Sequence, residues 1–213
     1  MKPVHLFLVG ALTLSACGGP EALTLPTDPV DRAATCAVVA AAAARTAVPD
    51  VQAPLPLAAQ GKIFHHALLA ASQGGTFEAE TANRVNKRMR ELEAGITAGK
   101  WRDLVPACDS AFAVTAKTEV ELPSGRFEAQ IACEELADFT SIALEGEERH
   151  FGNELAAYRR MRTELNDALA SGLSARAGSG SEAQSRERDR ALAAAAALGS
   201  PIPVLDKCRE RFK

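Results

Sequence analysis

Two sequence blocks that contain a cysteine occur twice along the chain, in the same order. Residues 25–36 and 122–133 both begin with Leu-Pro and a hydroxyl residue, and both continue with an apolar residue, an acid and a final cysteine. Residues 104–112 and 204–212 share two apolar residues, a cysteine and a final phenylalanine. The two cysteines lie 72 residues apart at the first occurrence and 75 at the second. Short matches arise by chance in an alanine-rich chain, but the shared order and spacing predict an internal duplication.

The duplication divides the chain into units at residues 25–112 and 122–213 and constrains its internal cysteines. An ancestral unit could close only its own bridge, which predicts two disulfides within the units, Cys36 with Cys108 and Cys133 with Cys208. Exchanged partners between the units and four buried free thiols are the alternatives. Each predicted bridge closes a loop of more than 70 residues. Such a bridge contributes about 4 kcal/mol in the chain-entropy model, which is a large share for a small core.

Composition predicts an all-α chain with a thin core. Alanine, the best helix former, supplies 43 of the 213 residues, and proline and glycine gather between the alanine-rich stretches. We therefore expect three or four helices in each unit, packed as a helical bundle. Aromatic residues make up only 5%, so little large apolar surface is available for burial. The linker between the units, residues 113–121, runs into the alternating stretch Thr118–Leu122, which predicts a possible minor β hairpin.

Capping residues and apolar spacing predict where the helices begin and which faces they bury. Thr27 or Asp28 caps the first helix, and Thr76 caps the third. In the second unit, Ser181 and Gln184 predict a capping box. The first two helices of that unit carry apolar side chains at helical spacing, which we expect to face the core: Phe127, Ile131, Leu136, Phe139 and Ile142, then Leu155, Tyr158, Met161, Leu165 and Ala168.

The first 17 residues have the features of an export signal. Met1-Lys2 gives a positive start, and Val4–Leu14 is an apolar run too short to span a bilayer. The tetrapeptide Leu14-Ser15-Ala16-Cys17 resembles the lipobox of bacterial lipoproteins. This resemblance covers residues 1–17 only. The mature part of the chain resembles no family that its motifs identify.

The lipobox resemblance implies cleavage before Cys17 and a lipid anchor on its sulfur. Residues 1–16 are then a signal peptide, and residues 17–24 are a lipidated tether. In enteric bacteria, an aspartate directly after the lipidated cysteine resembles the inner-membrane retention signal. This chain has Gly18 at that position, so we expect the protein to be anchored at the periplasmic face of the outer membrane. The alternative is an ordinary cleaved signal that ends at Ala16. Either pathway leads to an oxidising compartment, where the four remaining cysteines can form disulfides.

The sequence offers few candidates for catalysis or metal binding. It contains no phosphate-binding glycine loop, nucleophile elbow, paired-histidine zinc motif or haem attachment motif. Once the signal is removed, the remaining histidines are His65, His66 and His150. Glu147 and His150 have the spacing of di-iron helices, but those sites need a second such pair, so a solvated helix end is the better interpretation. Adjacent His65 and His66 point about 100° apart, and we expect one at the core and the other in solvent. The sequence therefore predicts no catalytic residue, metal site or cofactor.

Other conspicuous residues have structural interpretations. We expect Trp101 to be a buried anchor near Cys108 rather than a binding hot spot. The alanine run 40–44 predicts a tight helix contact, and the charged run Arg186–Arg190 predicts a solvent-facing helix surface. A net charge of -3 with scattered cations excludes the clustered positive charge that nucleic-acid binding requires.

Together these features predict a non-catalytic, membrane-anchored lipoprotein that faces the periplasm and binds an envelope protein or assists assembly. The alternative is a carrier of a small ligand or metal in the groove between the two units. A large apolar cavity lined by both units would favour the carrier. A filled core with an exposed apolar patch would favour partner binding.

Overall fold

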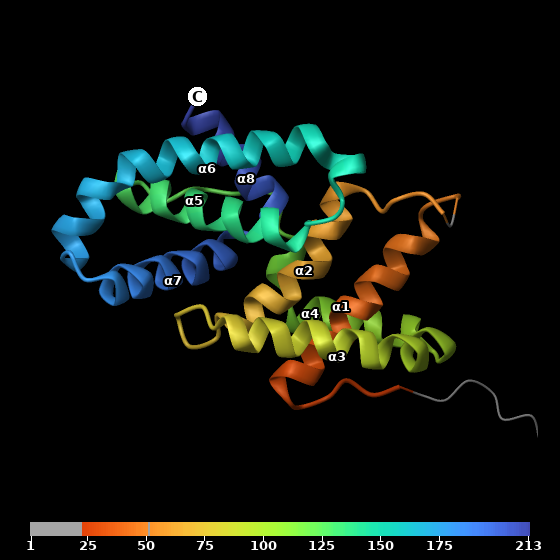
Figure 1. Ribbon diagram of the computed structural model, residues 1–213. Coiled ribbons are helices and arrows are strands. Elements are labelled where there is room, and N and C mark those ends of the chain that lie inside the picture. Colours follow the sequence, from red (N-terminus) through yellow and green to blue (C-terminus); the bar gives the residue numbers. More distant parts are fainter. Residues whose placement is uncertain (1–22, 51) are drawn as a thin grey trace, which may run out of the picture.

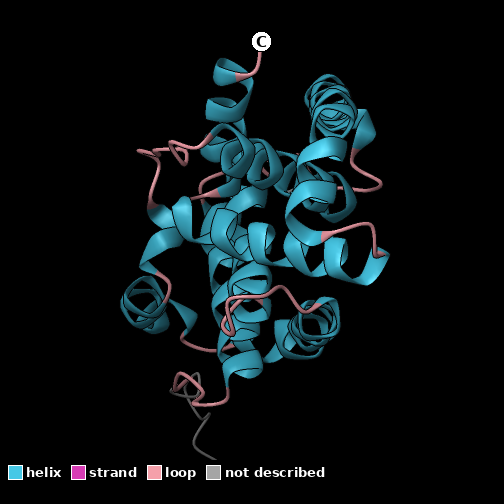
Figure 2. Ribbon diagram, turned by 90° about the vertical axis from the view of Figure 1, so that its left-hand side faces the viewer, coloured by secondary structure: helices cyan, strands magenta, loops and turns pink. Residues whose placement is uncertain are grey.

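The computed structural model describes residues 23–50 and 52–213, and all regular structure in these ranges is helical (Figures 1 and 2). The lipobox and Cys17 lie outside the described residues. The α-helices are α1 Pro29–Thr46, α2 Leu57–Ala71, α3 Ala79–Ala98, α4 Val105–Ala111, α5 Arg126–Ala143, α6 Glu148–Ala177, α7 Ser181–Leu198 and α8 Pro201–Arg211. Two short 3-10 turns, Trp101–Leu104 and Ala113–Ala116, flank α4. The all-α prediction is confirmed, and the helices form a bundle.

Local capping explains the start of α1 but not the starts of α3 and α7. The Asp28 carboxylate accepts hydrogen bonds from the backbone N–H groups of Val30 and Asp31, each at 2.9 Å, as expected for an N-cap. Thr76 does not cap α3, whose N-cap is Glu78 without a side-chain bond. Here the backbone is held by other elements, because Glu78 N–H donates to Ala71 O at 2.9 Å.

The predicted capping box at the start of α7 is also absent. Gly180 is the N-cap, and Ser181 is already the first helical residue. The Gln184 side chain instead donates to the carbonyl of Gly178 at 2.7 Å. The side chain that was expected to cap the helix therefore closes the preceding glycine turn.

In the first half, which comprises α1 to α4, α1 packs against both α2 and α3, which also contact each other (Figure 1). Ala33, Ala34 and Ala37 are fully buried on α1, and their small side chains allow the helices to approach closely. A disulfide joins Cys36 on α1 to Cys108 on α4, with a Cα–Cα distance of 5.3 Å. The thin core predicted from composition is thus supplemented by a covalent link from the first helix to the last.

The second half has a corresponding arrangement, in which α5 packs against α6, α7 and α8. A disulfide joins Cys133 on α5 to Cys208 on α8, with a Cα–Cα distance of 5.7 Å. Both bridges have the predicted partners. Ala168 was expected in the core but is exposed, because the buried stripe of α6 passes through Leu165 and Leu169.

Helix α2 connects the two halves, because it contacts α7 and α8 as well as α1 and α3. Leu68 on α2 belongs to the hydrophobic core of the second half. Gly61 lies so close to α8 that an added Cβ would be 2.7 Å from Ile202 Cγ1. Phe64 and Phe77 both contact the ring of Phe139 edge-on, at centroid distances of 5.9 and 5.5 Å. The halves therefore share an apolar interface.

The possible minor hairpin at the linker is not present. Residues 118–122 carry no strand, and the described ranges contain none elsewhere. The adjoining backbone bonds to the turn between α7 and α8, where Ser200 N–H donates to Lys117 O at 2.9 Å. An added Cβ on Gly199 would approach the same oxygen to 2.8 Å. The linker thus packs on a helix turn instead of pairing with a second strand.

Among the described residues, no single helix is long and apolar enough to cross a membrane. Helices α7 and α8 taken together are long and apolar enough, but the pair is bent by 108°.

Candidate functional site

A surface hollow of about 570 Å³ lies over α1 and α3. Its apolar lining comprises Val38, Ala41, Ala42, Leu55, Met89 and Ala143. Its polar lining comprises Arg45, Asn86, Arg90, Glu93 and Thr97. Val38 and Leu55 are buried, whereas Met89 is half-buried and contributes an adaptable thioether side chain to the lining.

The alanine run of α1 forms part of this hollow. Residues 40–44 are only half-buried, with Ala42 and Ala43 packed against the core of the first half, whereas the fully buried alanines of α1 lie earlier in the helix. Ala41 and Ala42 also line the hollow, where their methyl groups leave space that larger side chains would fill. The same small side chains therefore serve the helix contact and the hollow.

An exposed isoleucine directly precedes one of the residues that line the hollow. Ile142 on α5 directly precedes Ala143 and is 63% exposed, so the prediction that Ile142 faces the core is wrong. Thr140 and Ser141 take the inward positions instead, and the Ser141 hydroxyl can be buried because it donates to Ala137 O at 2.8 Å. Since Thr140 and Ser141 face the core at this turn of α5, Ile142 faces solvent. A large apolar side chain is therefore available for contact.

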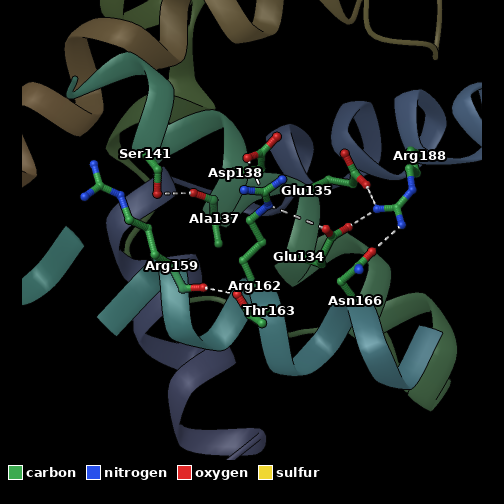
Figure 3. A network of polar contacts seen from close by, with 10 residues as sticks. All are labelled: Glu134, Glu135, Ala137, Asp138, Ser141, Arg159, Arg162, Thr163, Asn166 and Arg188. Carbon is green, nitrogen blue, oxygen red and sulfur yellow. Dashed lines mark hydrogen bonds and ion pairs between the residues drawn. The ribbon is translucent and has the colours of Figure 1, made fainter. Parts of the chain in front are cut away.

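A second candidate site is a charged network on α5, α6 and α7 (Figure 3). Arg188 on α7 donates through Nη1 to both Glu134 and Glu135 on α5. Its Nη2 donates to Asn166 Oδ1 on α6 at 2.8 Å. One guanidinium therefore joins three helices.

The network continues along α5 and α6. Arg162 Nε lies 3.0 Å from Asp138 Oδ1 and 3.9 Å from Glu134 Oε1. The Glu134 side chain is only 4% exposed, so its charge depends on these partners. A hollow of about 410 Å³ opens over the network, lined by Glu134, Glu135, Asp138, Arg162, Thr163, Asn166 and Arg188.

The surroundings of Glu135 favour the protonated form of its carboxyl group. Burial, followed by the hydrogen bond and negative charge of Glu134, raises the pKa of Glu135, while Arg188 opposes this effect. A carboxyl group that stays protonated near neutral pH can donate a hydrogen bond as well as accept one. The pair can therefore hold or release a proton close to physiological pH.

Sequence reasoning missed this network. The run Arg186–Arg190 was expected to face solvent, and its end residues do, pairing with Glu182 and Glu187 on the same helix. Arg188 instead turns toward α5 because its position on α7 faces the neighbouring helices. A signal was present in the two adjacent acids, Glu134 and Glu135, which interrupt the otherwise apolar middle of α5.

Both His65 and His66 are buried, so the expectation that one lies in solvent is wrong. His65 Nε2 hydrogen-bonds to Ala196 O on α7 at 2.8 Å, whereas His66 Nδ1 lies 2.9 Å from Lys62 O, and its ring meets Phe112 edge-on. Adjacent positions on α2 can both be covered because this helix lies between the two halves. Burial lowers the pKa of each imidazole from 6.5 to about 4.

The other predicted residues have the structural surroundings expected of them. Trp101 is buried in the first core, with the Arg102 guanidinium 4.5 Å from its ring centroid. His150 is exposed in the first turn of α6, next to the N-cap Glu147. Within residues 23–50 and 52–213, no group of three or more His, Cys, Asp or Glu side chains is placed to hold a metal ion.

The comparisons with known proteins leave these sites without a named counterpart. No family model, curated protein or solved structure matches the chain.

Proposed function

We propose that the protein is a non-catalytic, lipid-anchored helical lipoprotein that faces the periplasm and binds another envelope protein. The lipobox resemblance at Cys17 supports the anchor and an outer-membrane location. The two disulfides support passage through an oxidising compartment, where such bonds persist.

We further infer that the two units arose by duplication. The repeated cysteine blocks carry this inference, and the helix arrangement supports it. In each half the first helix packs against the next two and is bridged to the last. Differences in length, such as the 30 residues of α6 against the 15 of α2, are then later insertions or deletions.

The observation that carries partner binding is the α1–α3 hollow with exposed Ile142 beside Ala143. Its alanines permit close backbone approach, and Met89 can repack against different surfaces. Exposed Arg90 and Glu93, both from α3, border this apolar lining. The hollow therefore suits a protein segment, such as an amphipathic helix, whose apolar face is flanked by a carboxylate that can pair with Arg90.

The carrier alternative has weaker support. All residues that line the 570 Å³ hollow except Ala143 come from the first half, whereas a carrier groove between the units would be lined by both.

Site-specific photocrosslinking in intact cells tests the proposal. A photoreactive residue at Met89 and another at Ile142 should capture the same envelope protein, whereas one at exposed Arg160 on α6 should not. Arg90→Glu should reduce both captures, because it replaces the cation that would pair with the partner's carboxylate by an anion. Capture only of a second copy of the chain, or equal capture from Arg160, would contradict the proposed partner site.

A further inference from the structure

Residues 188 and 189 attach α7 to three other parts of the molecule. The Arg188 side chain bonds to α5 and α6, as described above. The carbonyl of Asp189 accepts a hydrogen bond from Phe77 N–H, at 3.0 Å, in the loop between α2 and α3. Residues 188 and 189 therefore lie where α7 meets α5, α6 and the loop between α2 and α3.

The charges around Arg188 do not balance when every acid is ionised. The ion pairs of this network join three carboxylates, from Glu134, Glu135 and Asp138, to the guanidinium groups of Arg162 and Arg188. Arg162 lies closer to Asp138 than to Glu134, so Glu134 and Glu135 share Arg188. Their side chains are 4% and 14% exposed, so water screens the surplus negative charge poorly. Retaining one proton on the pair removes this surplus.

We propose that Glu134, Glu135 and Arg188 form a proton-dependent clamp that holds α7 on α5 and loosens as the pH rises. With one proton on the pair, Arg188 neutralises the remaining carboxylate. When that proton is lost, the two carboxylates repel each other beside a single guanidinium. The pKa of Glu135, raised by burial and then by Glu134, has the direction that this clamp requires.

The other charged groups near the clamp also affect how the packing of α7 depends on pH. Asp138 and Arg162 pair on the α5–α6 side, and Asp189 adds a further carboxyl on α7. Burial, then the charge of Glu135, raises the pKa of Asp189, so its ionisation also loosens α7 at higher pH. His65 contacts the other end of α7 at Ala196 and has the opposite effect, because its neutral form is the buried one. Protonation of an exposed histidine becomes small above its usual pKa of about 6.5, so the clamp is tested above that value.

Hydrogen exchange between pH 6.5 and 7.5 tests the clamp in the full chain. Protection factors, corrected for the intrinsic pH dependence of exchange, are measured for the amides of α7 and, as an internal reference, of α1. If opening frees one carboxyl that is protonated in the closed state, protection of α7 should fall by up to about tenfold per pH unit. In Glu135→Gln, which carries a neutral amide in place of the carboxyl, this dependence should largely disappear.

Glu182→Gln is the matched control, because Glu182 is an exposed carboxylate on the same helix that pairs with Arg186. It should keep the wild-type dependence. Equal pH dependence in wild type and Glu135→Gln would overturn the clamp, as would an equal loss of protection in α1. If Glu135→Gln does not fold, carboxyl NMR titration of the wild-type protein decides the question. Titration of both Glu134 and Glu135 below pH 6 would refute the retained proton.

Discussion

The buried histidines predict that the fold loses stability in mild acid. His65 and His66 are 0% and 2% exposed, and both have a pKa of about 4 in the folded chain against 6.5 in a model peptide. Below pH 6.5 the unfolded chain binds protons that the folded chain does not, so lowering the pH favours unfolding. Their stabilising contribution is complete above pH 6.5 and is lost as the pH falls toward 4.

The magnitude follows from these pKa values. At pH 4 an unfolded histidine is almost fully protonated, whereas the folded one is half protonated. The difference costs about 3 kcal/mol per histidine, or about 6 kcal/mol for the pair, on the order of the whole stability of a small protein. The effect is large because His65 and His66 face different halves, and each lies in a covered site.

Urea denaturation followed by circular dichroism at pH 7, 5.5 and 4 measures this dependence. His65→Gln should be less stable than wild type at pH 7, because it disturbs the bond to Ala196, but its stability should fall less steeply with pH. His150→Gln is the control, because His150 is exposed and should leave the slope unchanged. Comparing slopes between variants removes the contribution of the carboxylates common to all three. The same slope in wild type and His65→Gln would refute a neutral, buried His65.

Three further predictions concern the anchor, the bridges and the contact between the halves. Cys17→Ser should move the protein from the membrane fraction to the soluble fraction, and unchanged membrane retention would contradict the lipoprotein proposal. Replacing Cys133 and Cys208 together by alanine should lower the free energy of unfolding by about 4 kcal/mol, as measured by urea titration, because their bridge closes a loop with a sequence separation of 75. Gly61→Ala should lower the free energy of unfolding by about 1–3 kcal/mol, because its Cβ would lie 2.7 Å from Ile202 Cγ1. In a protein that already carries Ile202→Ala, the same substitution should cost less. A Gly61→Ala protein as stable as wild type would show that α8 can move away at little cost.

The features that the sequence determined by itself were those set by local chemistry or by the repeated cysteine blocks. Alanine content and punctuation by proline and glycine predicted helices, and Asp28 marked the start of α1. The disulfide partners followed from the repeat, because a bridge within a unit needs no knowledge of how the units pack.

Only the tertiary structure decided which side chains meet across helices. The burial of both His65 and His66 depends on α2 lying between the halves, and the inward turn of Arg188 depends on where α5 and α6 lie beside α7. Ile142 is exposed because Thr140 and Ser141 face inward, although helical periodicity favoured the isoleucine. Periodicity gives the angle between positions on one helix, but burial depends on which other helices cover each angle. The hollow and the charged network were therefore accessible only from the folded chain.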